Sequence, residues 1–453
     1  MNSFVRFVEL NGGKCYSFAL PQNLLNNKFA AGNSSCVWYN DELIINTRLV
    51  DYIKMFQNTE FKCTNGSYAQ TYFYTKNGYD TRNVVSKFKN GELHDIHETI
   101  YPKEAYYDVH YRGLEDGRLV VWDNKLYIYG TRWDRMKDKG CICIYELEDG
   151  KHPVNEIVIP PQNYTNCEKN WSAVSDKPFT FVYWHNPTQI ISANNSGACW
   201  LVKEHPKNNN ITREIKGSSQ IVRYDENTYI SLVHTNDYYD KDGFNYSDYL
   251  TAFVIYNNDL DIIKMSDWFV FNSPMCEFTC GLTVHNDEIY ITYSQLDCTT
   301  NLLVTDRKTV NDFIDLKTDY NNTYNFIDYY NLAKQNEDNH QLNASYSLYN
   351  YALTLSDDSD ENKEKKVECA IKTLCGVITQ VPKLRVNFYT YINDCILNFI
   401  SKYPEVPEFY YLAALLSKSY GIQDGVKYYK ELGDKYKTNI HNYFFKYFNP
   451  NYL

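Results

Sequence analysis

Residues 113–135 read GLEDGRLVVWDNKLYIYGTRWDR, and the middle of this stretch is typical of a β-hairpin. Two short apolar strands flank the polar pair Asp123-Asn124, which is a common two-residue hairpin turn. Charged residues precede the first strand and end the second: Glu115, Asp116, Arg118 and Arg132. An acid and several cations therefore border one hairpin, and their role has to be inferred from the rest of the sequence.

The same unit of strand, polar turn and strand recurs in the first part of the chain. The copies are CVWYNDELIINTR from Cys36, LVVWDNKLYIYGTR from Leu119, QIVRYDENTYISLVH from Gln220, LTVHNDEIYITYS from Leu282 and, more weakly, FTFVYWHNPTQIISAN from Phe179. Repetition of a sheet unit every roughly 40 to 80 residues is typical of four-stranded propeller blades. We therefore predict a five-bladed β-propeller over residues 1–318. One or two β-sandwiches are the alternative, but they would not require a repeat.

Residues 325–453 show helical spacing instead. Segments EFYYLAALLSKSYG and GVKYYKELGDKYKTN are predicted helices, with Gly421 ending the first and Asp424 capping the second. Two more predicted helices, SYSLYNYALTL and VECAIKTLCGVITQV, flank a charged linker. We expect a small α-helical domain, either tetratricopeptide-like or a simple bundle. A bundle that supports the propeller is favoured over an array that binds a protein partner.

Composition narrows the class of protein. The chain has 453 residues, 43% of them hydrophobic, and a net charge of -11, which favours a globular protein and argues against a general nucleic-acid binder. The opening MNSFVRFVEL has charges within its apolar run, so it is predicted to be a strand rather than a signal peptide, and no transmembrane helix is expected. The 13 cysteines are scattered. We predict an unglycosylated cytoplasmic protein.

Polar residues at corresponding places in the units are the candidate site, because the inner strands of a propeller converge at one end of its channel. These residues are Asn33, Arg48, Asp116, Arg118, Arg132, Lys169, Asn170, His234, Glu277 and Asp297. No metal site is predicted, since the ten histidines are dispersed without paired ligand spacing. No organic cofactor is expected either.

The candidate set holds one well-placed acid, Asp116, among several cations. Glu115 and Asp116 are neighbours, so in a regular strand only one of them would face the channel, and we expect that one to be Asp116. Glycoside hydrolysis commonly needs two carboxylates, whereas phosphate brings its own nucleophilic oxygen and needs positive charge around it. The set therefore favours a phosphorylase over a hydrolase.

These residues resemble motifs of the β-mannoside phosphorylases and mannosidases of glycoside hydrolase family 130 and the related protist mannosyltransferase-phosphorylases. Residues 115–118 resemble the family's Glu-Asp-Pro-Arg, residues 33–35 with Arg48 its Asn-Pro-Ser and inner-strand Arg, and residues 169–170 its Lys-Asn. His234, residues 217–219 and residues 290–297 resemble further motifs. The resemblance covers roughly residues 28–305 and departs from the family at Ser34 and Gly117, where the family has proline.

The resemblance implies a five-bladed propeller and a role for each matching residue. Asp116 would be the general acid, acting through a sugar hydroxyl, and Arg132, Lys169 and His234 would bind phosphate, with Arg135 an alternative to Arg132. Asn33, Arg48 and Asp297 would hold the sugar in the −1 position. We also assign Arg118, Asn170 and Glu277 to the sugar side.

Three functions stay open on this evidence. The first is a carbohydrate-active enzyme that transfers a glycosyl group, in the first place mannosyl, between phosphate and an acceptor sugar by inverting phosphorolysis or its reverse. The second is a glycosyltransferase with a sugar-nucleotide donor such as GDP-mannose, whose diphosphate could occupy the same cationic pocket. The third is a non-catalytic propeller that binds glycans or proteins, with a protein partner recruited by the helices.

Overall fold

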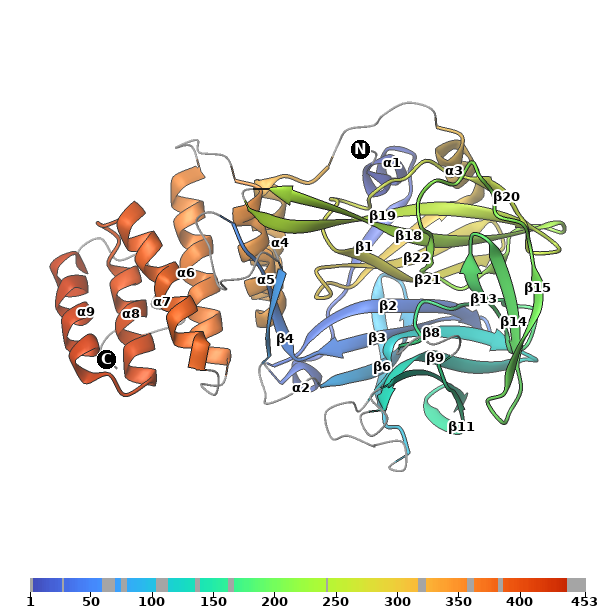
Figure 1. The fold of residues 1–453 in the computed structure, drawn as a ribbon, viewed down its shortest axis with the longest axis horizontal. Helices are drawn as coiled ribbons and strands as arrows, with labels where there is room; N and C mark the ends of the chain where they lie inside the picture. Colours follow the sequence, from blue (N-terminus) through green and yellow to red (C-terminus); the bar gives the residue numbers. More distant parts are fainter. Residues whose placement is uncertain are drawn as a thin grey trace.

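The computed structural model describes residues 3–26, 28–58, 70–74, 80–102, 113–134, 139–161, 167–241, 243–316, 323–356, 362–381 and 386–437. Its β-part consists of five sheets that form the blades of a propeller and one additional two-stranded sheet. The helices of the C-terminal part stand beside the blades (Figure 1). The inner strands β2 (Ala30–Tyr39), β8 (Glu115–Trp122) and β21 (Glu277–His285) contact one another, although they belong to different sheets. The predicted five-bladed β-propeller is confirmed.

The first three blades follow the chain in order. Blade one contains β2 (Ala30–Tyr39), β3 (Glu42–Val50), β6 (Thr81–Lys89) and β7 (Glu92–Thr99). Blade two contains β8 (Glu115–Trp122), β9 (Lys125–Asp134), β10 (Lys139–Glu148) and β11 (His152–Ile159). Blade three contains β12 (Ser172–Ala173), β13 (Thr180–His185), β14 (Thr188–Ala193) and β15 (Cys199–Glu204).

The last two blades are less regular. In blade four the short strands β16 (Lys216–Gly217) and β17 (Val222–Arg223) both pair with β18 (Thr228–Lys241), which continues to β19 (Phe244–Asn257) and β20 (Ile262–Met265). Blade five contains β21 (Glu277–His285), β22 (Glu288–Gln295) and β23 (Asn301–Asp306), and β1 (Lys14–Ser17) is its fourth strand. A strand from the beginning of the chain thus completes the last blade.

The repeat units are hairpins of these blades. Four of them are the first two strands of a blade, but the weaker unit from Phe179 forms β13 and β14, which are the second and third strands of blade three. The predicted turn at Asp123 and Asn124 is confirmed, and both residues have the positive φ (48° and 59°) that the favoured hairpin turns require. The unit from Phe179 is displaced by one strand because all four strands of a blade have a similar alternation of apolar residues.

The prediction of a strand at the N-terminus was wrong. Residues Phe4–Leu10 form α1, which begins after Ser3, whose hydroxyl accepts a hydrogen bond from the Arg6 backbone N–H. Phe4, Val5 and Val8 are buried in a cluster with blades four and five. Their spacing suits one face of a helix, so burial of that face decided the structure. Two further short helices belong to this part, α2 (Gln22–Leu25) and α3 (Arg307–Ile314).

Helices follow the propeller as predicted. They are α4 (Phe326–Asp338), α5 (Leu342–Thr354), α6 (Lys363–Gln380), α7 (Val386–Lys402), α8 (Pro407–Ser419) and α9 (Gln423–Lys435). They stand in a row beside the propeller, with α4 and α5 against it and α9 farthest away (Figure 1). Gly421 ends α8 with a φ of +73°, as expected. Asp424 is not the cap of α9, because that helix already begins at Gln423.

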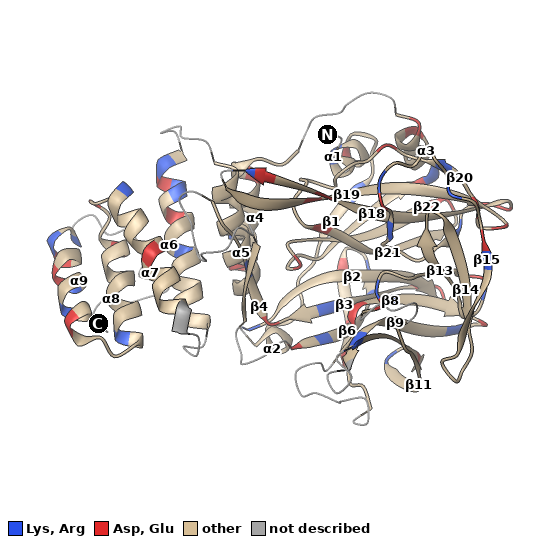
Figure 2. Cartoon of the chain, viewed as in Figure 1, with Lys and Arg blue, Asp and Glu red and all other residues tan. Residues whose placement is uncertain are grey.

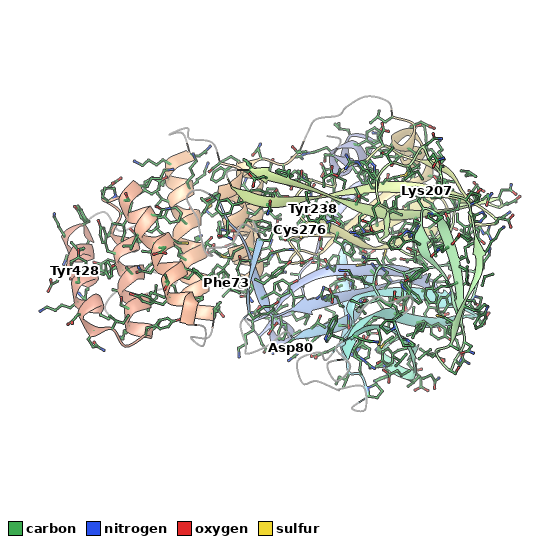
Figure 3. The ribbon with its side chains drawn as sticks, viewed as in Figure 1. Phe73, Asp80, Lys207, Tyr238, Cys276 and Tyr428 are labelled. Atoms are coloured by element: carbon green, nitrogen blue, oxygen red, sulfur yellow. The ribbon has the colours of Figure 1, made fainter. Side chains whose placement is uncertain are left out.

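A hairpin inserted in blade one joins the two parts. It consists of β4 (Tyr52–Phe56) and β5 (Gln70–Tyr74), and its apolar residues share one buried cluster with α4 to α8 (Figure 3). Much of the domain boundary proposed at 318–325 lies outside the described residues, so that division stays a prediction. None of the helices that the structure describes is long and apolar enough to cross a membrane. Acidic and basic residues intermingle along the helices and outer strands (Figure 2).

Candidate functional site

The candidate residues come together where the innermost strands of the blades begin. Asn33 and Asp116 lie at the starts of β2 and β8, Asn170 precedes β12, and Ser218 follows β16. Asp297 joins them from the loop after β22. Hydrogen bonds among these residues and Arg118 join all five blades at this end of the inner strands.

Asp116 lies in an irregular stretch of β8. The register with β9 shifts between Glu115 and Arg118, and Asp116 has a φ of +50°. Its Oδ1 accepts hydrogen bonds from Asn33 Nδ2 and Arg48 Nη1, both at 2.9 Å. The carboxylate is therefore held by blade one, and its side chain remains 18% exposed.

The bulge changes the expectation for Glu115. Strand alternation would send Glu115 away from Asp116, but the register shift removes the regular alternation on which that expectation rests. Burial raises the pKa of the Glu115 carboxyl, and the charges of Arg48, Asp116 and Lys169 also act on it. Glu115 thus lies within the same group of charges as Asp116.

Three neighbours donate hydrogen bonds to the Asp297 carboxylate. Its Oδ1 accepts a hydrogen bond from Asn33 Nδ2 at 3.1 Å, and its Oδ2 accepts from Lys54 Nζ at 2.9 Å and Tyr52 Oη at 3.1 Å. Burial opposes the charged form, but Lys54 and Arg48 outweigh it and lower the pKa of Asp297 to about 2. Asn33 bridges Asp116 and Asp297, so the two carboxylates belong to one network.

Arg118 is buried with neutral partners. Its guanidinium donates to the Ser218 carbonyl, to the Asp116 carbonyl at 3.1 Å and to Asn170 Oδ1 at 3.4 Å. It is 2% exposed and lies over the Phe278 ring. All of these acceptors are uncharged, so the positive charge is solvated by dipoles rather than cancelled by a carboxylate.

His234 lies beside this cation. Its Nδ1 is 2.8 Å from Ser218 Oγ, and its ring stacks on Tyr249. Burial first, and then Lys216, Arg118 and Lys169, hold the pKa of His234 well below its usual value. Burial and the three neighbouring cations thus act on the imidazole in the same direction. Gly217 permits this arrangement, because a Cβ there would lie 2.3 Å from the Asn170 carbonyl oxygen.

Two predicted residues have other partners. Arg132 Nη1 donates to Tyr145 Oη at 2.7 Å and forms an ion pair with Glu156, and both partners are on outer strands of blade two. Both oxygens of Glu277 accept hydrogen bonds from the backbone N–H groups of residues 271–273. Burial raises the pKa of Glu277 to about 8 although these donors oppose the rise. Arg135 lies outside the described residues.

Sequence reasoning missed Lys54 and Tyr52. Lys54 is 2% exposed, and Asp297 holds its pKa well above the usual value despite its burial. Lysine is almost never fully buried unless it is paired, so a lone Lys in the apolar run YIKMF was a usable signal. The β4–β5 hairpin interrupts blade one and falls outside the repeat, which is why comparison of the units did not reach it.

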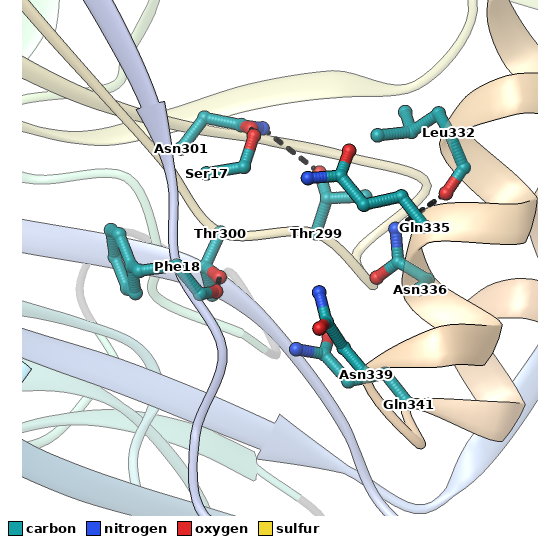
Figure 4. A pocket seen from close by; sticks show the side chains of 10 residues that line it. All are labelled: Ser17, Phe18, Thr299, Thr300, Asn301, Leu332, Gln335, Asn336, Asn339 and Gln341. Carbon is teal, nitrogen blue, oxygen red and sulfur yellow. Dashed lines mark hydrogen bonds between the residues drawn. The ribbon is translucent and has the colours of Figure 1, made fainter. Parts of the chain in front are cut away.

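Other features of the described chain are less suited to chemistry. No group of three or more His, Cys, Asp or Glu side chains in the described residues is placed to hold a metal ion. A small pocket between blade five and α4 is lined by uncharged groups, among them Thr299, Asn301, Gln335 and Gln341 (Figure 4). It offers hydrogen bonds but no acid, base or charge.

Comparison with known proteins finds similar solved structures but no match by sequence. No protein-family model matches the chain, and no curated protein matches its sequence. A β-1,2-mannobiose phosphorylase from Listeria innocua has 11% identity and a TM-score of 0.42, over 66% of this chain and 99% of that one. A mannose phosphorylase from Leishmania mexicana, in complex with phosphate ion, has 12% identity and a TM-score of 0.40, over 67% and 92%.

A glycosyl hydrolase from Bacteroides ovatus has 12% identity and a TM-score of 0.39, over 62% of this chain and 85% of that one. Mannoside phosphorylases, which the sequence motifs resemble, are thus among the solved structures to which the chain is similar. The five-bladed fold itself follows from the strand order of this chain.

Proposed function

We propose that the protein is a carbohydrate-active enzyme that transfers a glycosyl group, mannosyl in the first instance, between phosphate and an acceptor sugar. The observation that carries the proposal is Arg118, a buried cation whose described acceptors are all neutral. A buried charge of this kind is stabilised when an anion arrives. Arg118 and Lys169 lie close enough to His234 for their charges to act on its imidazole.

The site has two sides that meet at residues 116–118. Arg118, Lys169 and His234 form the anion side, and Asn33, Arg48 and Asp297 surround Asp116 on the sugar side. Arg118 also donates to the backbone carbonyl of Asp116, which joins the two sides directly. Phosphate held by the first set would therefore approach a sugar held by the second.

The chemistry is a single displacement. A phosphate oxygen attacks the anomeric carbon, the bond to the leaving oxygen breaks, and Asp116 supplies the proton that the leaving oxygen takes, through a sugar hydroxyl as the family resemblance implies. Attack from the opposite face inverts the anomeric configuration. In the reverse direction the Asp116 carboxylate accepts the proton from the acceptor sugar.

Hydrolysis is the second candidate, because Glu115 adds a carboxylate beside Asp116. An inverting hydrolase needs one carboxyl as acid and another as the base that activates water. Burial raises the pKa of Glu115, which is a feature of many catalytic carboxyls. The cationic side of the site has no role in hydrolysis, so we rank this function second.

The test is turnover with defined donors. The protein is incubated with mannose 1-phosphate and a panel of acceptor sugars, and released phosphate is measured. Parallel reactions contain GDP-mannose, or β-mannosides without phosphate. We expect phosphate release in the first reaction and a loss of about 10²- to 10⁴-fold with Asp116→Asn.

A matched control separates chemistry from folding. Asp123→Asn changes the same atoms at the exposed turn of the same hairpin and should turn over like the wild type. Turnover only with GDP-mannose would make the protein a sugar-nucleotide-dependent transferase, and release of mannose without phosphate would make it a hydrolase. No turnover with any donor, acceptor or mannoside would reject this mannosyl-transfer proposal in favour of a binding propeller.

A further inference from the structure

Helix α5 closes the free edge of strand β4. One edge of β4 pairs with β5, and backbone groups on the other edge meet side chains of α5. Ser347 Oγ accepts a hydrogen bond from the Lys54 backbone N–H at 3.0 Å. Asn350 Oδ1 accepts from the Phe56 N–H at 2.6 Å, and Asn350 Nδ2 donates to the Phe56 carbonyl at 3.3 Å. Ser347 and Asn350 are fully buried, so these bonds fix the strand.

The same strand holds Asp297. Residues two apart in a strand project to the same face, which places the Tyr52 and Lys54 side chains together. Both donate to Asp297 Oδ2, at 3.1 and 2.9 Å. Tyr52 and Lys54 are 4% and 2% exposed, so their positions are set by packing rather than by solvent.

A continuous chain of contacts therefore runs from the helices to the proposed acid. It leads from Asn350 and Ser347 through β4 to Asp297, and from Asp297 through Asn33 to Asp116. The anion side of the site has a further support, because Arg118 and His234 are also held by Ser218. Arg118 meets this chain of contacts at the Asp116 backbone carbonyl and not at its carboxylate.

We propose that α5 is a positioning element of the sugar side, so that the helical segment is a working part of the site rather than a separate partner-binding unit. The ligand part of this inference rests on the proposed function, with Asp297 and Asn33 as sugar contacts. It predicts that loosening α5 from β4 weakens binding of a sugar phosphate more than binding of phosphate alone.

The test compares two ligands in two variants. Asn350→Ala removes both bonds to Phe56, and Ser347→Ala is the milder change that removes one bond to Lys54. Affinities for inorganic phosphate and for mannose 1-phosphate are measured by calorimetry. We expect Asn350→Ala to lower the affinity for mannose 1-phosphate about tenfold and the affinity for phosphate less than about twofold, and Ser347→Ala to show the same split at smaller size.

Tyr349→Phe is the matched control on the same helix. Tyr349 is buried, and its hydroxyl contacts Glu337 and Lys372 of neighbouring helices rather than β4. This variant should lose some stability and keep both affinities. Equal weakening of both ligands by Asn350→Ala, or no weakening of either, would overturn the inference.

Amide hydrogen exchange gives a readout that needs no ligand. Peptides that cover residues 295–298 should exchange faster in Asn350→Ala than in wild type and Tyr349→Phe, because Asp297 loses its support. Unchanged exchange in these peptides would overturn the positioning role. If the wild type binds neither ligand, the proposed function fails, and this exchange experiment alone decides whether α5 positions Asp297.

Discussion

Arg118 and Arg132 come from the two strands of one hairpin, and both are buried, at 2% and 7% exposed. Arg132 forms an ion pair with Glu156, so its charge is cancelled within blade two. The described acceptors of Arg118 are carbonyl and amide oxygens, which leave the charge in place. We infer from this difference that Arg132 stabilises blade two and that Arg118 is the residue available to an incoming anion.

This contrast suggests another phosphate-binding set, which stays a proposal. From the sequence we assign Arg132 to phosphate and Arg118 to sugar, whereas the contacts favour Arg118 as the phosphate ligand. Lys54 repeats the pattern of Arg132, since its partner is the Asp297 carboxylate. Substitution of these residues tests whether the partner of a cation, rather than its place in a motif, decides its role.

The largest effect is expected for Lys54→Met, which leaves the Asp297 carboxylate, only 16% exposed, without its cation. Removal of one partner from a buried pair costs about 3–5 kcal/mol, so the free energy of unfolding at pH 7 should fall by that amount. The pKa of Asp297 is lowered from 3.8 to about 2 in the folded protein, so the contribution of the pair is complete above pH 4 and is lost as the pH falls through 2. Urea unfolding at several pH values measures this.

Wild type and Lys54→Met should therefore converge in stability as the pH falls from 4 towards 2. A difference that stays constant over this range would show that Lys54 stabilises the fold by packing of its alkyl chain and not by its charge.

The next effect is on binding. Arg118→Met should weaken the affinity for inorganic phosphate by about a hundredfold, which corresponds to about 2.7 kcal/mol, because charge-assisted hydrogen bonds to the anion are lost. Arg132→Met should leave the affinity within about twofold. Calorimetry with phosphate at fixed ionic strength distinguishes them. The reverse order would restore Arg132 to the phosphate site.

Part of the fold and of the candidate site can be predicted from the sequence. The repeated hairpins predict five blades because alternating apolar residues and positive-φ turn residues are local features. They also place Asn33, Asp116, Asn170, His234 and Asp297 at one end of the channel. The partner of each charge depends on tertiary contacts instead. Glu156 is 24 residues from Arg132, and three backbone amides fix Glu277, so neither partnership has a sequence signal.

Segments outside the repeated units were the second obstacle to predicting the fold and the site from the sequence. Lys54 lies in a hairpin that no other blade repeats, and β1 completes blade five from the other end of the chain. Both depend on contacts between distant segments. The helix at the N-terminus was mistaken for a strand because a run of seven residues is too short for its period to be recognised.

A smaller effect is expected on stability for Arg132→Met. Glu156 is 25% exposed and can be partly solvated when its partner is lost, so the free energy of unfolding should fall by about 2 kcal/mol. Arg118→Met, measured without ligand, should change it by less than about 1 kcal/mol, since a buried unpaired cation is itself unfavourable. Urea titration without phosphate gives both values. A larger loss for Arg118 would make it a structural residue.

A small effect is also expected for Gly117→Ala, in the bulge between Asp116 and Arg118. The added Cβ would lie 3.0 Å from Asn46 Nδ2 and 3.1 Å from both Asn83 Nδ2 and Ile128 Cδ1. Relief of these contacts would shift Asn46, which also donates to the Gly117 carbonyl at 2.8 Å. Crowding of a packed site costs about 1–3 kcal/mol, and the lower entropy of the unfolded chain returns about 0.4–1 kcal/mol, so a net loss of about 1 kcal/mol is expected. Phosphate affinity should change less than about twofold, because the acceptors of Arg118 remain. If affinity falls as far as in Arg118→Met, the bulge rather than the arginine alone sets the anion side of the site.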